Sequence, residues 1–152
     1  NSLLFKQFPN EKFAGSVPDL MRESTDASFS TLNNWTLSDD AIPRIQSDNV
    51  YEGSNAVQFG SIDSYGDDSS FEVIVNVKKA SVISFYALKN NNIGTLRFDV
   101  DGYSKLSTSS TISPWTKYSY SLSAGVHTLK WYYYKYSSTA ENVYIDDITI
   151  SP

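Results

Sequence analysis

The sequence contains no cysteine and a single histidine. Without cysteine the chain has no disulfide framework and no thiol chemistry, so a fold of 152 residues must rest on its apolar core. A chain of this size buries about 70% of its unfolded surface, which is enough for such a core. One histidine cannot build a zinc site, and we expect His127 to have a structural role.

Long apolar runs and basic clusters are missing as well. The apolar runs are all only a few residues long, Val82-Ile83 among them, so no segment can span a bilayer. The formal charge of −5, with no Lys/Arg cluster to offset it, repels a phosphate backbone, and we expect no nucleic-acid binding. Because the sequence opens at Asn1, we expect a domain cut from a longer protein, with linked neighbouring domains, rather than a chain that has lost its signal segment.

Motifs of common catalytic sites are also missing. The sequence has no Gly-Lys-Ser/Thr phosphate loop, no Gly-x-Ser-x-Gly elbow and no His-Glu-x-x-His pattern. Its acidic residues, such as Glu52, Glu72 and Glu141, are scattered, and nothing singles out two of them as a glycosidase pair. We therefore expect that the chain is not an enzyme.

Short alternating segments separated by turn residues fill most of the chain. Tyrosine supplies 11 residues, many of them in these segments, which we expect to be strands at 57–59, 71–77, 82–87, 96–100, 118–122, 128–134, 143–145 and 148–150. Asp101-Gly102 is the strongest hairpin signal. Regularly spaced short strands predict an all-β antiparallel β-sandwich, a jelly roll, over residues 26–152. Residues 1–25 are expected to be a lead-in or linker on the domain edge, with a short helical turn after Pro18.

Residues 124–131 (AGVHTLKW), followed by 143–148 (VYIDDI), resemble the closing hairpin of MAM-like and carbohydrate-binding-module-like jelly rolls. Such domains occur in bacterial surface proteins, exported hydrolases and phage tail proteins. The resemblance covers about residues 28–151 and implies the fold, whereas ligands vary widely within it. It also implies that Trp35 and Trp115 close the ends of the sandwich as core residues.

The acidic pair Asp146-Asp147 is the candidate metal site. Strict alternation gives Asp146 the parity of Ile148 and Ile150, and a carboxylate on the core face needs a partner. Calcium is one such partner and a salt bridge is another; exposure of both carboxylates to water would remove the need for one. The resemblance implies structural calcium, with help from carbonyls near residues 54–55, although Ser30 stands where such domains often have a glutamate, unless Glu23 or Asp26 replaces it.

Outward tyrosines are the candidate ligand-binding residues. Alternation places Leu129, Trp131 and Tyr133 on one face of their strand and the other tyrosines on the opposite face. Flat, part-apolar rings of this kind stack on sugar rings or anchor a protein partner, whereas ordinary cross-strand pairing is the alternative. The candidate ligand-binding set is Tyr132, Tyr134 and Tyr136, with Tyr86 and Tyr103 as further contributors.

These features predict a non-catalytic carbohydrate-binding module of a larger exported or surface-associated protein. Its expected partner is a glycan, a polysaccharide or a cell-wall or host sugar, and its expected location is extracellular, at a cell surface or on a virion. The alternative is a structural or adhesive spacer, or a protein-binding domain, of a bacterial surface or phage tail protein. A phage host-recognition module would combine the two.

Overall fold

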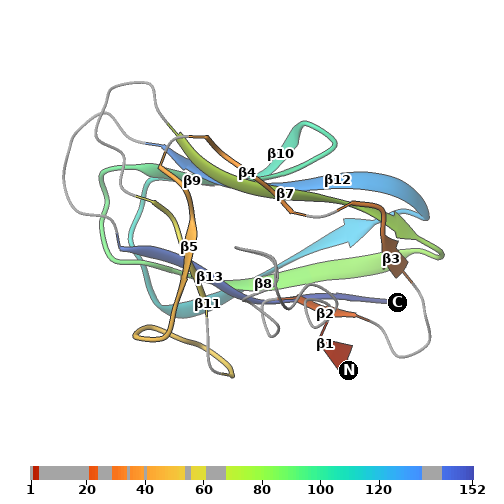
Figure 1. Cartoon of the computed structure of the whole chain (residues 1–152), viewed down its shortest axis with the longest axis horizontal. Coiled ribbons are helices and arrows are strands. Elements are labelled where there is room, and N and C mark those ends of the chain that lie inside the picture. Colours follow the sequence, from red (N-terminus) through yellow and green to blue (C-terminus); the bar gives the residue numbers. More distant parts are fainter. Residues whose placement is uncertain are drawn as a thin grey trace.

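Two β-sheets pack face to face and form the body of the protein (Figure 1). The computed structural model describes residues 2–3, 21–23, 29–33, 35–39, 41–53, 56–60, 68–134 and 142–152. Within these ranges every regular element is a strand, and no helix is long and apolar enough to cross a membrane. The predicted all-β antiparallel sandwich is therefore confirmed.

The first sheet, here the β12 sheet, has the strand order β10-β9-β12-β7-β3, and β4 also pairs with β7. Its strands are antiparallel, and β12 pairs with β7 over ten residue pairs, from Gly125 opposite Val77 to Tyr134 opposite Asp68. These strands are β3 (Phe29–Thr31), β4 (Thr36–Leu37), β7 (Asp68–Val77), β9 (Thr95–Val100), β10 (Tyr103–Thr108) and β12 (Gly125–Tyr134).

The second sheet, here the β8 sheet, is centred on β8 and β13. β11 pairs with β8, β8 pairs with β13, and the other edge of β13 pairs with β6 and, in parallel, with β2. These strands are β1 (Ser2–Leu3), β2 (Met21–Glu23), β5 (Arg44–Gln46), β6 (Ala56–Gln58), β8 (Ser81–Lys89), β11 (Ile112–Leu122) and β13 (Val143–Ser151).

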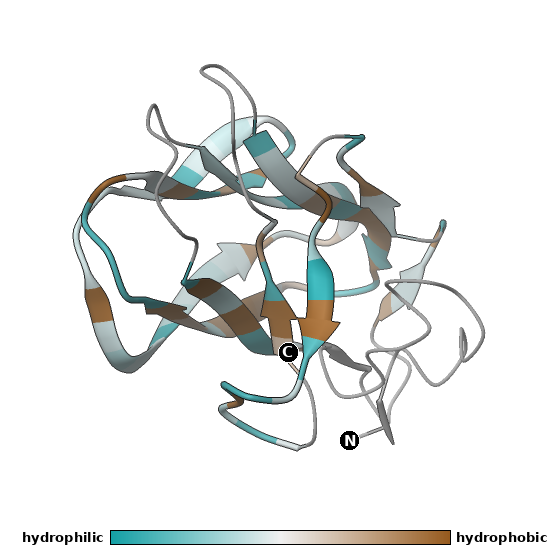
Figure 2. Cartoon of the chain, turned by 60° about the vertical axis from the view of Figure 1, so that its left-hand side comes forward, coloured by the Kyte–Doolittle hydropathy of each residue, from teal (hydrophilic) through white to brown (hydrophobic). Residues whose placement is uncertain are grey.

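Aromatic and branched side chains from both sheets fill the space between them. Along the central strands these side chains alternate with polar ones, and hydrophobic and hydrophilic bands alternate along the ribbons in Figure 2. The ring of Trp131 stacks on Phe71 with centroids 5.3 Å apart, lies 4.7 Å from Phe98 and meets Phe85 edge-on at 5.7 Å. Trp131 thus joins β7, β9 and β8 and anchors β12 across the sandwich.

Of the local features predicted from the sequence, the Asp101-Gly102 hairpin is confirmed and the helical turn after Pro18 is corrected. Asp101 and Gly102 both have positive φ, 54° and 83°, as the tight β9–β10 hairpin requires. The helical turn expected after Pro18 is wrong where the chain is described, because Met21–Glu23 is strand β2. Pairing with the edge of β13 supplies backbone hydrogen-bond partners that a single helical turn would leave unmade. The predicted domain boundary at residue 26 stays a prediction.

A buried lysine lies at one end of the sandwich. Lys89, at the end of β8, is 0% exposed. Its ammonium donates to the backbone oxygens of Asn91 and Ser109 at 2.6 and 2.9 Å and to Asn91 Oδ1 at 3.2 Å. A charge removed from water is tolerated only with such partners. Lys89 therefore ties the β8–β9 and β10–β11 connections together.

Replacement of this lysine by an apolar side chain of similar length tests that role. We expect Lys89→Met to lower the free energy of unfolding by about 1–3 kcal/mol, because the carbonyls of Asn91 and Ser109 lose their charged donor. Urea-induced unfolding measures the change. Lys78→Met, at an exposed position of the β7–β8 turn, is the matched control and should change stability by about 0.5 kcal/mol or less. Equal stability of the two variants would contradict the role of Lys89.

Candidate functional site

The outward row of tyrosines predicted on β12 is present in the part that the structure describes. Leu129, Trp131 and Tyr133 are fully buried, whereas Tyr132 and Tyr134 alternate with them and are part-exposed on the outer face. The rings of Tyr132 and Tyr134 are nearly parallel, 24° apart, with centroids separated by 6.0 Å. Tyr136 lies outside the described residues.

Two cations lie over the ring of Tyr132. The guanidinium of Arg97, on β9, and the ammonium of Lys130, on β12, each lie 5.1 Å from the ring centroid. Arg97 also forms an ion pair with Asp99 at 3.2 Å. Burial and the negative charge of Asp99 hold the pKa of Tyr132 above its usual range, although Arg97 opposes this. The hydroxyl of Tyr132 is therefore protonated, and able to donate, at neutral pH.

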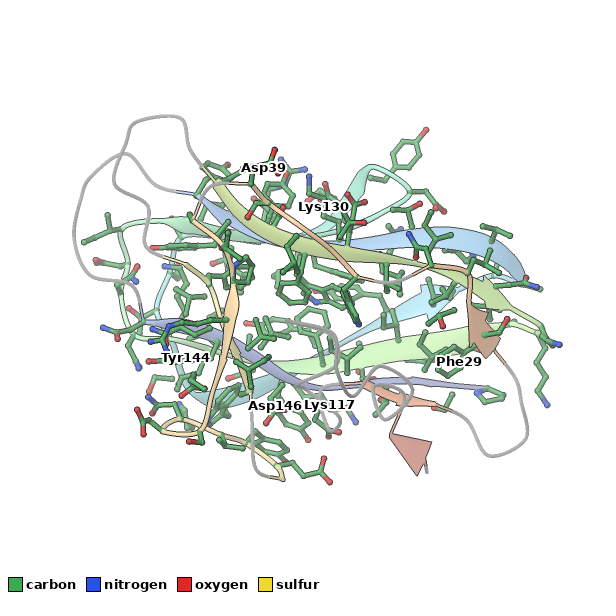
Figure 3. All side chains as sticks on the ribbon, in the orientation of Figure 1. Phe29, Asp39, Lys117, Lys130, Tyr144 and Asp146 are labelled. Atoms are coloured by element: carbon green, nitrogen blue, oxygen red, sulfur yellow. The ribbon has the colours of Figure 1, made fainter. Side chains whose placement is uncertain are left out.

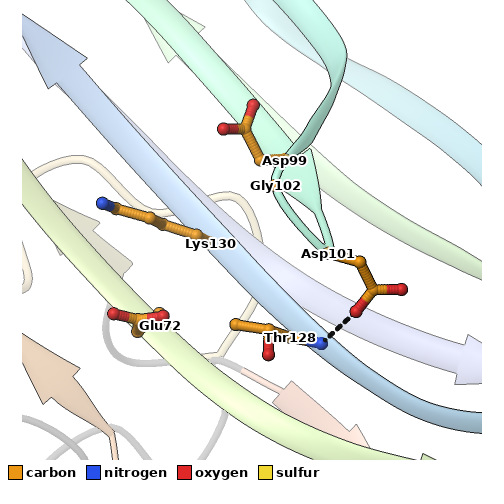
Figure 4. Close-up of a pocket in the computed structure, with 6 residues that line it drawn as sticks. All are labelled: Glu72, Asp99, Asp101, Gly102, Thr128 and Lys130. Carbon is orange, nitrogen blue, oxygen red and sulfur yellow. Dashed lines mark hydrogen bonds between the residues drawn. The ribbon is translucent and has the colours of Figure 1, made fainter.

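A hollow adjoins this tyrosine on the outer face of the β12 sheet, and Figure 4 shows the residues that line it. Its volume is about 520 Å³. Three carboxylates and one ammonium contribute to a polar lining drawn from β7, from β12 and from β9 with its hairpin turn. The lining residues are Glu72, Asp99, Asp101, Gly102, Thr128 and Lys130.

The lining residues differ in how many hydrogen bonds and ion pairs their side chains form within the protein. Asp99 pairs with Arg97, and Asp101 accepts the backbone N–H of Thr128 at 2.8 Å. Glu72 and Lys130 face each other across β7 and β12, and neither shows a hydrogen bond or ion pair within the described ranges. A carboxylate and an ammonium thus remain able to accept and donate hydrogen bonds at the floor of the hollow.

His127 has the structural role expected of it, because it holds one wall of the hollow. Its Nδ1 lies 2.6 Å from Asp101 Oδ2, and its Nε2 lies 2.8 Å from the backbone oxygen of Ser123. Burial lowers the pKa of His127, but the hydrogen bonds to Asp101 and Ser123 outweigh it, so this pKa is raised. The pKa of Asp101 is lowered: burial opposes the shift, and the hydrogen bonds with His127 and Thr128 overcome it.

The five candidate tyrosines do not form one surface. Tyr132 and Tyr134 lie on the β12 sheet, whereas Tyr86 is on β8, in the other sheet. Tyr103 begins β10 directly after Gly102 of the hollow and is 75% exposed, which puts it at the rim. Tyr86 stacks on Tyr51, with ring centroids 3.6 Å apart.

Of the two tryptophans expected in the core, one is elsewhere. Trp35 is 8% exposed and packs against Phe71 and Trp131. Trp115 is part-exposed and contacts Tyr51 and Tyr144 instead of the core cluster. Its strand has a register irregularity between Ile112 and Thr116, so simple alternation does not place it.

Asp146 is buried, but the parity predicted for it is wrong. Asp146 pairs with Tyr86 and Thr149 pairs with Ser84, so β13 advances three residues while β8 advances two. The extra residue is a bulge at Asp147, whose φ is +49°. Ile145 and Ile148 therefore share the core face, and Asp146 points to the opposite face of the β8 sheet.

Backbone N–H groups surround the Asp146 carboxylate. Its Oδ2 accepts from the N–H of Tyr51 and of Glu52, each at 3.0 Å, and its Oδ1 accepts from Asp147 N at 2.8 Å. N–H donors do not ligate calcium, and no cluster of three or more His, Cys, Asp or Glu fit for a metal occurs in the described ranges. This donor set does not fit the ion. Calcium stays a prediction, because residues 54–55 lie outside the described residues.

Sequence reasoning did not bring together the residues that make this face polar. Glu72, Asp99 and Lys130 come from three strands and meet only through the pairing of β7, β12 and β9. Each has the outward parity of its strand, a signal available from the sequence. Which strands are neighbours is set by the topology, and alternation alone does not reveal it.

The Asp101–His127 pair predicts how stability depends on pH. The raised pKa of His127 adds stability that is complete below the ordinary imidazole value of 6.5 and is lost as pH rises through the folded-state value. The lowered pKa of Asp101 adds stability that is complete above 3.8 and is lost as pH falls through the folded-state value. Thermal melts should therefore show a plateau between about pH 4 and 6.5.

The pair contributes on the order of 1 kcal/mol or less, because the Asp101 side chain is 42% exposed and solvent screens it. His127→Gln should remove the decline above the plateau and keep the decline below it that other carboxylates produce. An unchanged alkaline slope in this variant would contradict the assignment.

Asp146→Asn tests the anchoring of the 47–53 loop. The amide group of asparagine places N–H hydrogens against one of the backbone donors, so we expect a loss of about 1–3 kcal/mol in the free energy of unfolding. Asp48→Asn, at an exposed residue of the same loop, is the control. Equal stability of Asp146→Asn and the wild type would contradict the anchoring role.

Thermal melts of the wild type and of Asp146→Asn, run in calcium and in EGTA, measure this loss and also test the calcium prediction. Saturation of a site present only in the folded protein raises stability by about 2–4 kcal/mol. Such a rise, lost in Asp146→Asn, would support the ion. Equal melting temperatures in both media would contradict it.

No protein-family model and no curated protein matches the sequence. Solved structures do resemble the chain. The CBM22-1 xylan-binding domain of Xyn10C from Paenibacillus barcinonensis aligns with a TM-score of 0.51 and 17% identity, over 80% of this chain and 87% of that domain. The secreted serine protease VesC from Vibrio cholerae aligns with a TM-score of 0.58 and 13% identity, over 83% of this chain.

Tailspike protein 4 of bacteriophage CBA120 aligns with a TM-score of 0.50 and 14% identity, over 82% of this chain. The chain spans only 25% of the protease and 19% of the tailspike domain, so each likeness concerns one part of a larger protein. The chain thus has the β-sandwich fold of carbohydrate-binding modules, as the sequence resemblance implied.

Proposed function

We propose that the chain is a non-catalytic carbohydrate-binding module that holds a glycan on the outer face of the β12 sheet. One observation carries the proposal: the paired rings of Tyr132 and Tyr134 lie beside a polar hollow of about 520 Å³. The aromatic pair and the hollow supply the two kinds of contact that a sugar ring needs, and Tyr136 and Tyr103 are proposed to extend them.

Stacking is the first of these contacts. A pyranose ring has an apolar face of C–H groups and an equatorial belt of hydroxyls. The exposed part of a tyrosine ring packs against the apolar face. Arg97 and Lys130 cover part of the Tyr132 ring and already hold it in place, so the part that stays exposed loses little entropy on stacking. Tyr134 continues the aromatic surface along β12.

Hydrogen bonding is the second contact. Sugar hydroxyls both donate and accept, so they match a surface with groups of both kinds. Glu72 offers acceptor oxygens and Lys130 offers donors side by side at the floor of the same hollow. Lys130 also lies over the ring of Tyr132, but neither side chain forms a hydrogen bond or an ion pair among the described residues. Because the lining carries three carboxylates and one ammonium, it disfavours an acidic glycan, and a neutral glycan fits best.

The same carboxylates argue against catalysis. Hydrolysis of a glycosidic bond by the common mechanism needs two carboxyl groups, one as acid and one as base or nucleophile. In the hollow, Asp99 is paired with Arg97 and Asp101 with His127. Among the described residues, Glu72 is the one carboxylate of the lining without such a partner, which supports binding without turnover.

A structural or adhesive spacer is the rival function. A spacer requires only that its outer tyrosines pair with neighbours on a flat face, and it has no use for a hollow lined by uncommitted charges. The hollow beside Tyr132 therefore favours glycan binding. We place the module in a larger exported, cell-surface or virion-associated protein, supported by resemblance to parts of a secreted protease and of a phage tailspike.

Affinity gel electrophoresis in soluble xylan, galactan and dextran tests the proposal. We expect retardation of the wild type by at least one polysaccharide. Tyr132→Ala should weaken that binding about tenfold or more, equivalent to about 1.4 kcal/mol, because the stacking surface is removed. Lys130→Ala should weaken it less.

Lys78→Ala removes an exposed lysine at the far end of β7 and is the matched control for Lys130→Ala; it should bind like the wild type. Circular dichroism checks that each variant is folded. Lack of retardation in a wider glycan panel, full binding by Tyr132→Ala, or hydrolysis of any of the polysaccharides would each contradict the proposal.

A further inference from the structure

A second aromatic surface lies on the opposite side of the sandwich. Tyr86 on β8, Trp115 on β11 and Tyr144 on β13 meet Tyr51 from the loop between β5 and β6 on the outer face of the β8 sheet. Figure 3 shows Lys117 and Asp146 of the β8 sheet on the lower side and Lys130 of the β12 sheet on the upper side. The two aromatic surfaces therefore face away from each other.

Tyr51 presents one flat face to solvent. Its ring stacks on Tyr86 with centroids 3.6 Å apart and planes 15° apart, so the inner face is covered. The residue is nevertheless 44% exposed. Trp115 lies beside it with a centroid distance of 6.2 Å and an angle of 56°. Tyr51 and Trp115 thus form an open corner of two aromatic rings.

The loop that carries Tyr51 is held firmly in place. The buried carboxylate of Asp146 accepts the N–H groups of Tyr51 and Glu52. Gln46 accepts the N–H groups of Asp48 and Asn49 at 2.9 and 2.8 Å. A loop fixed by side chains beneath it has already lost its conformational freedom, so a ligand that binds there need not order it.

Two polar side chains border the corner. Asn49, on the same loop, donates to the Tyr144 hydroxyl at 3.1 Å. Lys117 is exposed and lies directly opposite Tyr86 in the β8–β11 pairing. The hydrogen bond to Tyr86, together with the charges of Asp147 and Glu52, raises the pKa of Tyr51, so its hydroxyl is protonated at neutral pH.

The size of this surface distinguishes a sugar from a protein partner. A stable protein interface buries about 800 Å² on each side, with a largely apolar centre. Here Tyr144 is buried and Tyr86 is covered by Tyr51, which leaves the Tyr51–Trp115 corner, and the adjoining β8 and β11 positions Ser84 and Ser119 are hydrogen-bonded serines. An isolated pair of rings amid polar residues matches one or two sugar rings.

We propose that Tyr51 and Trp115 form a second glycan-binding surface, so that one domain holds two glycan chains on opposite faces. A sugar ring stacks on the outer face of Tyr51 against the tilted ring of Trp115, and Lys117 donates to its hydroxyls. This surface shares no residue with the β12-sheet face, so a substitution that removes glycan binding at one surface leaves binding at the other intact.

Tryptophan fluorescence isolates the second surface. Trp35 and Trp131 are 8% and 0% exposed, whereas Trp115 is part-exposed, so a ligand on the β8 sheet changes chiefly the emission of Trp115. We expect soluble xylan, galactan or dextran to shift the wild-type emission. Tyr132→Ala should keep the shift, Tyr51→Ala should raise its midpoint concentration about tenfold or more, and Trp115→Phe should abolish it.

Ser121→Ala, at another exposed position of β11, is the control and should behave like the wild type. Light scattering adds a second readout, because a domain with two surfaces bridges polysaccharide chains and a domain with one does not. Unchanged emission in a wild type that is still retarded in the gel would overturn the second surface and leave the proposed function standing. A normal shift in Tyr51→Ala, or lack of a shift with every polysaccharide, would also overturn it.

Discussion

β12 lies between β7 and β9, and the two-residue pleat of this strand sends its side chains alternately into the core and to the surface. Trp131 is fixed from the inside by Phe71, Phe98 and Phe85, so the strand cannot slip without exposing the whole core. The same register turns Tyr132 outward. The outward position of these tyrosines on the strand is therefore a consequence of core packing, and Arg97 and Lys130 then hold the ring of Tyr132 in place.

In the β8 sheet, an interruption of that alternation also fixes an aromatic side chain at the surface. The bulge at Asp147 lets Ile145 and Ile148 both face the core and leaves Asp146 on the outer face. A carboxylate buried there must be satisfied, and the N–H groups of the 47–53 loop satisfy it. Because the buried carboxylate requires these N–H partners, the loop is held in the position that presents Tyr51 at the surface.

Alternation along the sequence predicts the sandwich, the Asp101–Gly102 hairpin and the two faces of β12, because each depends on residues close together in the chain. Alternation predicts the wrong side of the sheet for Asp146, because a bulge shifts the parity by one residue and the local sequence pattern gives no sign of it. The meeting of Glu72 with Lys130 and of Tyr51 with Trp115 depends on which strands are neighbours. Those contacts are set by tertiary packing alone.

The central claim is that a glycan binds the outer face of the β12 sheet. Amide chemical-shift mapping of the labelled domain, titrated with soluble xylan and galactan fragments, tests it residue by residue. The account predicts the largest shifts at Lys130, Tyr132 and Tyr134, with neighbouring changes at Glu72 and Arg97. Shifts confined to the edges and loops of the sandwich, with the centre of β12 unperturbed by every glycan that binds, would contradict it.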